Sequence, residues 1–495
     1  MISFWIIFLL MLIGSLGVLR VAQRIKSMQK EQQLIYLGQL KKLQKELDRY
    51  KYQEYLEHAW IDAYYTQVIQ PIQKKDPTIA SKISSQRLPD VYHLLIDKEA
   101  GVEQIQSYFI QKELRDYESF FDTLLNNPLT PMQRKAVITH EENNLILAGA
   151  GSGKSSVIVA KVAYLLEKAY ATPQEILILS FNKKAKEELI KRMHQIGIKG
   201  VSIKTFHGLG RAIALESYEI DKSMEFNEMI TLATQALKEQ HYHSPYLYLL
   251  VDEFQDISMD RNALLLALKE QNDANLTAVG DDWQAINGFA GGEIKIIQNF
   301  PAIYGNTKII KLDYTFRFSQ AMARLSARFI LKNPQQIPKD IKSIKTTPRN
   351  PLEIHHYKNH QEISTIIEQI LQKISQNHPT RRQTVMILSR YGFQKPKNIT
   401  QLQQQFPSLK LTALTIHASK GLESDHVIVT HLESGKFGFP PTREASQDEA
   451  FKDAQERRLF YVALTRSKEQ LFLICHHLKP SPFVVEIEKL KNTLM

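Results

Sequence analysis

The sequence has very little cysteine: Cys475 is the only one in 495 residues. A single cysteine excludes an intramolecular disulfide and a zinc site built from cysteines. Because Cys475 lies in the apolar run 471–475, we expect it to be a small core residue. The sequence also lacks internal repeats, a nuclease-like carboxylate cluster and a module for reading DNA sequence, so it does not predict those classes of protein.

Acidic residues are fewer than basic ones. The 52 Asp and Glu against 63 Lys and Arg give a formal net charge of +11, with a pI near 9.2. This excess favours a polyanionic partner, either nucleic acid or an anionic membrane surface, although a merely basic soluble protein is an alternative. The length predicts two to four domains with room for large cores.

Charged residues are absent from the first 19 positions. Ile2–Leu19 is just long enough to span a bilayer, and Arg20, Arg24, Lys26 and Lys30 follow at once. By the positive-inside rule these cations hold the following chain in the cytoplasm. No basic region precedes the run and no clear cleavage site follows it, which favours an uncleaved anchor over a signal peptide or a buried helix. The sequence therefore predicts a single-pass protein of the cytoplasmic (inner) membrane, with residues 1–19 as the transmembrane anchor.

Residues 20–126 are expected to form a basic, helical N-terminal region. Proline is absent from residue 20 until Pro71. Leu37, Leu40, Leu43, Leu47 and Tyr50 recur at helical spacing, which predicts a long amphipathic helix. We expect its apolar stripe to pack on the neighbouring domain and its basic face to lie near anionic lipid headgroups. Further helices are expected beyond residue 77, including residues 102–125.

From Asn127 onward short apolar runs alternate with helical segments. This alternation predicts an α/β fold with parallel sheets covered by helices. The expected strands are Leu145–Ala148, Ile176–Ser180, Tyr248–Val251, Leu276–Val279, Lys308–Leu312, Gln383–Leu388, Leu411–Thr415, His426–Thr430 and Gln470–Cys475.

A glycine-rich loop follows the first of these strands. It exposes backbone N–H groups at the start of a helix, where the helix dipole favours phosphate. Lys154 would reach the β- and γ-phosphates of a nucleotide, and the Ser155 hydroxyl would bind Mg²⁺. Ala148 stands at the first glycine of the general pattern, so an ordinary strand-turn-helix is the alternative for the motif alone. The expected loop residues are Ala148, Gly149, Ala150, Gly151, Ser152, Gly153, Lys154, Ser155 and Ser156.

Two adjacent carboxylates end the strand at residues 248–251. Asp252 would lie beside Mg²⁺, and Glu253 would orient or deprotonate the attacking water. An acidic turn after a strand is common by itself. Together with a phosphate loop about 100 residues upstream, it predicts hydrolysis of ATP with Mg²⁺ as the cofactor, and we expect no other metal.

The motifs between Leu129 and Arg466 resemble those of superfamily 1 helicases of the UvrD/Rep group, in the family's order. The resemblance implies two RecA-like P-loop NTPase domains, residues 127–311 and 312–495, with ATP in the cleft between them. It also implies ATP-dependent 3′→5′ movement on single-stranded DNA or 3′-tailed duplex DNA. Composition says nothing about direction.

The resemblance assigns further residues to the nucleotide. Gln133 would read adenine, Phe316 would stack on it and Glu423 would bind the ribose. Gln284 would couple the γ-phosphate to the DNA surface, and Lys420 would lie near phosphates. Arg317 and Arg466 would stabilise charge on the transferred phosphoryl group when the cleft is closed.

The resemblance also implies contacts to the DNA strand. Asn287 stands where a tyrosine is usual and Ala290 where arginine or serine is common, so the base contacts of this segment are expected to be weaker. A core aromatic is the alternative for Phe181. The expected DNA-contacting residues are Phe181, Lys184, Thr205, His207, Trp283, Phe289 and His417.

Short spacings indicate a reduced motor. Larger members of the family insert accessory subdomains between Thr205 and Asp252 and between Arg317 and Thr415. Here only residues 211–247, expected as two helices, remain in the first gap, which favours translocation over processive unwinding. Two alternatives stay open: a motor directed at RNA or RNA polymerase, and a membrane-tethered scaffold with weak ATPase. The sequence indicates no protein partner and no pathway.

Overall fold

The computed structural model describes residues 2–219, 224–288, 291–345, 350–378, 381–442, 451 and 453–494. For residues 2–17, 85, 226 and 494 the description covers the backbone alone. The chain divides into two compact units. The N-terminal unit is Met1–Glu118 with Thr139–Glu142, and the second unit is Ser119–Ile138 with Asn143–Met495.

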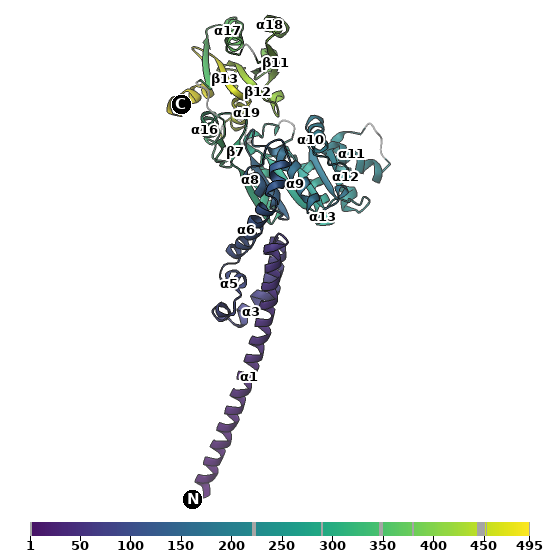
Figure 1. Ribbon diagram of the computed structural model, residues 1–495, viewed down its shortest axis with the longest axis vertical. Coiled ribbons are helices and arrows are strands. Elements are labelled where there is room, and N and C mark those ends of the chain that lie inside the picture. Colours follow the sequence, from purple (N-terminus) through teal and green to yellow (C-terminus); the bar gives the residue numbers. More distant parts are fainter. Residues whose placement is uncertain are drawn as a thin grey trace. The chain divides into compact units, whose positions relative to one another are not determined.

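The N-terminal unit is helical, as predicted. Its first helix, α1, runs without a break from Ile2 to Tyr52 (Figure 1). The expected apolar stripe is buried, with Leu40, Leu43 and Leu47 fully covered. The prediction that it packs on the neighbouring domain is wrong, because its partners are the following helices of the same unit. These helices are α2 (His58–Tyr64), a π-helical turn (Tyr65–Ile69), α3 (Gln70–Lys75), α4 (Ile79–Ile83), α5 (Pro89–Ile96) and α6 (Lys98–Asp116).

The predicted membrane anchor falls on the first part of α1. The side chains of residues 1–17 lie outside the described part of the structure. Among the residues that were described, no helix has the length and apolar character needed to cross a membrane. The anchor therefore stays a prediction from the sequence.

The second unit contains a six-stranded parallel sheet of order β3-β2-β4-β5-β1-β6 within the described residues. β1 and β2 are buried along their whole length, which fits apolar central strands covered on both faces. The strands are β1 (Asn143–Ala148), β2 (Ile176–Ser180), β3 (Ser202–Thr205), β4 (Tyr248–Val251), β5 (Asn275–Gly280) and β6 (Thr307–Leu312). The accompanying helices are α7 (Glu118–Thr123), α8 (Pro131–Ile138), α9 (Lys154–Glu167), α10 (Lys183–Gln195), α11 (Phe206–Ser217), α12 (Phe226–Lys238), α13 (Met259–Asn272), α14 (Ile294–Gln298) and α15 (Phe300–Tyr304).

A five-stranded parallel sheet of order β11-β10-β12-β13-β9 follows in the same unit. Alternate side chains of its strands enter two cores, one under α17 and one under α16, α19 and α20. The strands are β9 (Leu352–Tyr357), β10 (Gln383–Ser389), β11 (Leu409–Thr415), β12 (Ser424–Leu432) and β13 (Ser467–His476), and β7 (Tyr314–Thr315) pairs with β8 (Lys342–Ser343). The helices are α16 (Gln320–Ile330), α17 (Glu362–Asn377), α18 (Ile399–Gln405), α19 (Ala454–Leu464) and α20 (Pro482–Leu494). The predicted α/β class with parallel sheets is confirmed.

Candidate active site

The glycine-rich loop joins β1 to α9, which begins at Lys154. Gly151 and Gly153 have φ of +73° and +82°, a region that favours glycine. A Cβ on Gly151 would lie 2.5 Å from Cβ of Arg317, so the loop passes close to the segment that leads into the second sheet. Phe316 N–H donates to the Gly151 carbonyl at 2.9 Å and fixes this approach.

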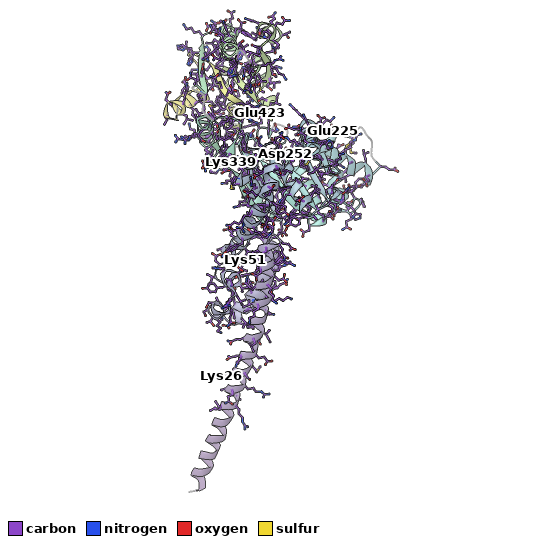
Figure 2. All side chains as sticks on the ribbon, viewed as in Figure 1. Lys26, Lys51, Glu225, Asp252, Lys339 and Glu423 are labelled. Carbon is purple, nitrogen blue, oxygen red and sulfur yellow. The ribbon has the colours of Figure 1, made fainter. Side chains whose placement is uncertain are left out.

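A cavity of about 1570 Å³ opens over the loop. Asp252 and Glu423, both labelled in Figure 2, are far apart in the sequence. Both line the cavity. Ala148 does not line it, because its side chain is buried at the end of β1, and its predicted contact to the nucleotide stays a prediction. The other predicted nucleotide, metal and catalytic residues all line the cavity: Gln133, Gly149, Ala150, Gly151, Ser152, Gly153, Lys154, Ser155, Ser156, Asp252, Glu253, Gln284, Phe316, Arg317, Glu423 and Arg466.

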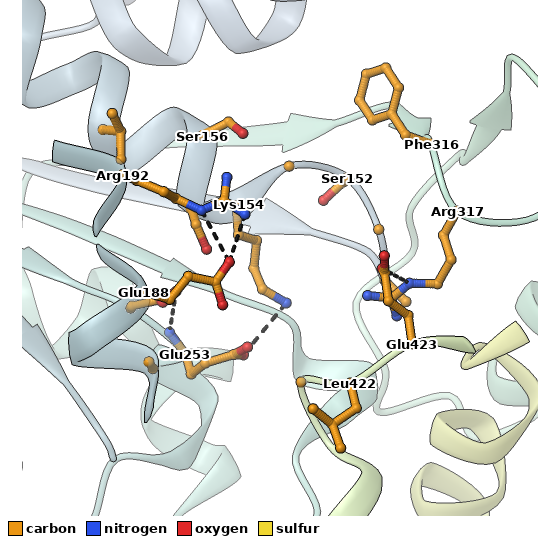
Figure 3. A pocket seen from close by; sticks show the side chains of 18 of the residues that line it. Ser152, Lys154, Ser156, Glu188, Arg192, Glu253, Phe316, Arg317, Leu422 and Glu423 are labelled. Carbon is orange, nitrogen blue, oxygen red and sulfur yellow. Dashed lines mark hydrogen bonds and ion pairs between the residues drawn. The ribbon is translucent and has the colours of Figure 1, made fainter. Parts of the chain in front are cut away.

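Lys154 faces the two carboxylates that follow β4. Its Nζ lies 3.5 Å from Oε2 of Glu253 (Figure 3), which also accepts from Gln255 Nε2 at 2.6 Å. The positive charges of Lys154 and Lys420 hold the pKa of Glu253 below its usual range despite burial. Burial and the neighbouring Glu253 charge raise the pKa of Asp252, so ionising this carboxyl group costs free energy. A bound cation would offset that cost. A hydroxyl from Ser155 and the Asp252 carboxylate are oxygen ligands that suit Mg²⁺.

Two guanidinium groups reach the cavity from the segments around the second sheet. Arg466 is buried, and its Nη2 donates to Gln284 Oε1 at 2.9 Å. Arg317 donates from Nη1 to the Thr465 carbonyl at 3.1 Å. Burial and the charge of Arg317 lower the pKa of Arg466 to about 9. An anion such as a phosphoryl group would offset the electrostatic repulsion between these two cations.

Glu423 and Gln133 are engaged by protein groups. Glu423 lies 2.9 Å from Arg317 Nε (Figure 3). It also lies 2.8 Å from Lys468 Nζ, so its carboxylate is part of an ion-pair network. Gln133 donates to the Ser152 carbonyl at 2.9 Å and accepts from the Thr130 N–H at 2.9 Å. The Gln133 amide thus holds the phosphate loop. The predicted contacts of Glu423 to ribose and of Gln133 to adenine stay predictions.

Asp256 is a site residue that the sequence reasoning missed. Lys420 Nζ donates to its two carboxylate oxygens at 2.7 and 2.5 Å and to the Gln284 carbonyl at 2.9 Å. Lys420, expected near phosphates, therefore ties the β11–β12 connection to the turn after β4. The available signal was the position of Asp256 in the same acidic motif, four residues after Asp252.

The predicted DNA-contacting residues are divided in the structure. Phe181, Lys184 and His417 line the cavity. Phe181 is half-buried, packs on Phe206 and has the Arg261 guanidinium 5.2 Å from its ring centroid.

Thr205 and His207 lie outside the cavity. Thr205 Oγ1 accepts from Gly208 N–H and caps α11, which also carries His207. Neither residue lines the cavity, and Phe289 lies outside the described residues.

Trp283 is not a stacking residue in this structure, so that prediction is corrected. Its side chain is fully buried, its Nε1 donates to the Ile337 carbonyl at 3.0 Å and its ring packs edge-on against Tyr461. Lys339 Nζ lies 4.4 Å from the indole centroid and pairs with Asp281 and Asp282. The indole therefore anchors a buried ionic cluster and has no face open to a base.

An exposed aromatic group on the second sheet was also missed. Tyr391 and Phe393 follow β10 and stack at a centroid distance of 5.5 Å, and Phe437, after β12, packs edge-on against both. Phe393 and Phe437 are 65% and 52% exposed. Nζ of the exposed Lys436 lies 5.6 Å from the Phe437 ring centroid, and the exposed Lys395 and Lys397 follow Phe393 closely in the sequence. Aromatic faces among cations are typical of surfaces that bind single-stranded nucleic acid.

Two family models match the chain. The one described as UvrD/REP helicase N-terminal domain matches residues 129–222 and 214–304. The one described as UvrD-like helicase C-terminal domain matches residues 395–477. Together the matches cover slightly more than half of the chain.

Individual proteins are also similar to this chain. DNA helicase IV of Escherichia coli (strain K12) is 29% identical, with 80% of this chain and 75% of that protein covered. The ATP-dependent DNA helicase PcrA of Bacillus subtilis (strain 168) is 23% identical, with 45% of this chain and 42% of that protein covered.

Proposed function

Because the chain belongs to the UvrD-like helicase family and is an ATP-hydrolysing DNA helicase, we propose that it moves 3′→5′ along single-stranded DNA. The observation that carries the proposal is the cavity in which Lys154 and the carboxylates after β4 face Arg317 and Arg466. These groups come from segments associated with two different sheets. Such an arrangement can couple the hydrolysis state of a bound nucleotide to the distance between the two sheets.

The residues divide the chemistry among themselves. Lys154 and the loop N–H groups would hold the phosphates, and Glu253, whose lowered pKa keeps it ionised, would orient the attacking water and take its proton. Ser155 and Asp252 would hold Mg²⁺, which neutralises charge on the phosphate oxygens when bound. Arg317 and Arg466 would stabilise the charge that develops on the transferred phosphoryl group.

Closure of the cleft would convert hydrolysis into movement. Arg466 contacts Gln284 at the end of β5, and Lys420 contacts Asp256 after β4. Both links join the second-sheet segments to the first sheet at the cavity. Loss of the γ-phosphate would remove the anion that the two arginines share, so the links would loosen and the grip on DNA would alternate.

The aromatic group of Tyr391, Phe393 and Phe437 is proposed as the base-stacking surface, in place of the buried Trp283. We expect Phe393→Ala and Phe437→Ala each to weaken single-stranded DNA binding about fivefold or more, because stacking contributes about 1–3 kcal/mol per base. Fluorescence anisotropy with a labelled oligonucleotide measures this. Tyr52→Ala, at an exposed aromatic of the N-terminal unit, is the matched control. Unchanged affinity in both phenylalanine variants would contradict the assignment.

The test of the proposed function is steady-state ATP hydrolysis by the protein lacking residues 1–19. It is measured without nucleic acid and with single-stranded DNA, duplex DNA or RNA. Strong stimulation by single-stranded DNA is expected, together with displacement of a streptavidin block from the 5′ end and not from the 3′ end. Preference for RNA would favour the RNA-directed motor, and absence of stimulation would favour the tethered scaffold.

The proposal also places the protein at the cytoplasmic membrane. Its support is the uncharged segment Ile2–Leu19 and the cations that follow it. The full chain is expected to sediment with membranes and to resist extraction by high salt, whereas the protein lacking residues 1–19 should stay in the supernatant with its ATPase intact. Sedimentation of the shortened protein with membranes would contradict the anchor.

A further inference from the structure

Three ligand-type side chains meet beside the second sheet at positions that the motor mechanism does not use. His378 ends α17, His426 lies in β12 and Glu469 lies in β13. Among the residues that the structure describes, this is the one group of three His, Cys, Asp or Glu side chains whose ligand atoms all lie within 4.8 Å of one another. The three elements lie together in Figure 1.

The distances suit a bridging ion better than direct contact. Oε2 of Glu469 lies 3.8 Å from Nε2 of His378 and 3.8 Å from Nε2 of His426. Both separations are too long for a hydrogen bond. A tetrahedral zinc ion with bonds of about 2.0–2.2 Å separates its ligand atoms by about 3.4 Å. Both carboxylate–imidazole separations are therefore within a few tenths of an ångström of those at a zinc ion, and all three ligand atoms lie within 4.8 Å of one another.

Buried polar atoms without hydrogen-bond partners lie at this place. His426 is fully buried, and neither of its ring nitrogens has a hydrogen-bond partner. Gln383, fully buried at the start of the adjacent strand β10, has no partner for either amide atom. Buried polar groups are satisfied in nearly all proteins, so the His426 imidazole has nitrogens available for a ligand.

The backbone is shaped to bring Glu469 to the histidines. β12 and β13 pair with a register shift: Ser424 lies opposite Ser467, but His426 lies opposite Gln470. The extra residue is in β13, in the short stretch that contains Glu469. A bulge of this kind redirects side chains and is frequent next to functional sites. Arg381 is 3.8 Å from Oε1 of Glu469 and leaves Oε2 facing the imidazoles.

We infer that His378, His426 and Glu469 form a binding site for a divalent transition-metal ion, with zinc as the best match to two imidazoles and one carboxylate. Three protein ligands leave a fourth position for water. The ion joins the end of α17 to the starts of β12 and β13. Glu423 and Arg466, which line the nucleotide cavity, precede His426 and Glu469 by three residues each, so the ion also fixes the strand starts next to the cavity.

No sequence spacing indicates this site, because its ligands come from three separate elements that only the fold brings together. The single cysteine excluded a thiolate site, and Mg²⁺ was the one metal expected from the sequence. The site is independent of the proposed DNA motor: it would exist whether or not the chain moves on DNA.

The test is zinc binding by the full-length protein after tag removal and dialysis against a chelator. Isothermal titration with zinc chloride should give one saturable site per chain in addition to any weak binding. His378→Gln and Glu469→Gln should weaken that site at least tenfold, and these side chains are 31% and 30% exposed, so both variants should fold. Zinc should raise the melting temperature of the parent protein and not that of either variant.

His360→Gln is the matched control. His360 also lies beside a glutamate of this sheet, but its Nε2 contacts Oε1 of Glu433 directly at 3.0 Å, so it has no gap for an ion. Its zinc affinity should equal that of the parent protein. Cobalt(II) in place of zinc should give the visible absorption of a tetrahedral nitrogen and oxygen site in the parent and the control. The absence of a saturable site, or equal zinc affinity in His378→Gln and Glu469→Gln, would overturn the inference.

Discussion

Replacing Lys154 with alanine is expected to lower kcat for ATP hydrolysis at least about 10²-fold, the loss typical when one preorganised charge-stabilising group is removed. The Lys154 ammonium faces the carboxylate of Glu253 across the cavity and has no place in a hydrophobic core. The free energy of unfolding should therefore change little. Coupled-enzyme ATPase assays and a thermal melt measure the two quantities.

Glu253→Gln tests the other half of the same site. It keeps the size of the side chain and the bond from Gln255, but it removes the base, so hydrolysis should fall about 10²–10⁴-fold while ATP still binds. Lys191→Ala, at an exposed lysine of α10, should hydrolyse ATP normally. Retained turnover in either Lys154→Ala or Glu253→Gln would sink the assignment of roles.

The buried strands were predicted well because their continuous apolar sequences are typical of few structures other than a buried strand. The bounds of β2 and β4 agree with prediction, and the other seven expected strands were found with ends one to three residues longer. Continuous apolar runs between loops are typical of strands covered on both faces. β3 and β9 were missed because each is an edge strand with partly exposed, polar positions: Ser202–Thr205 and Leu352–Tyr357.

The residues of the site could be predicted where they belong to short sequence motifs. The glycines of the loop and Lys154 stand at fixed offsets in one segment, the carboxylates directly follow β4 in another, and the structure gathers them around one cavity. Trp283 was misjudged because an aromatic residue among carboxylates does not reveal which of its faces is covered. Its burial depends on Lys339 and Ile337, which lie more than 50 residues further along the chain.

Exposure and long-range contacts explain the other omissions. Phe393 and Phe437 become one aromatic surface only when β10 and β12 lie side by side. Lys420 was expected near phosphates, but in the fold its ammonium group forms an ion pair with the Asp256 carboxylate. Hydrogen-bond partners chosen by tertiary structure cannot be read from periodicity, which reports only which face of an element is covered.

The second large effect is expected at the two arginines. Arg317→Lys and Arg466→Lys should each lower kcat for DNA-stimulated hydrolysis by about 10³-fold or more, the contribution typical of an arginine finger. A lysine keeps the positive charge, but it cannot reproduce the planar fork with which Arg466 holds Gln284 and the Leu422 carbonyl and still faces the cavity. ATP affinity should change less than kcat, because charge on the phosphoryl group is greatest in the transition state.

The control separates catalysis from folding. Arg328→Lys makes the same change at an exposed arginine of α16 outside the cavity, and it should leave hydrolysis intact. Single-turnover kinetics with a fluorescent ATP analogue distinguish slow chemistry from slow binding, and single-stranded DNA affinity without nucleotide should be unchanged in all three variants. Near-normal kcat in Arg317→Lys and Arg466→Lys would mean that Arg317 serves only its ion pair with Glu423 and that Arg466 serves only its hydrogen bond to Gln284. That result would contradict the proposal that Arg317 and Arg466 drive movement by sharing one phosphoryl group across the cleft.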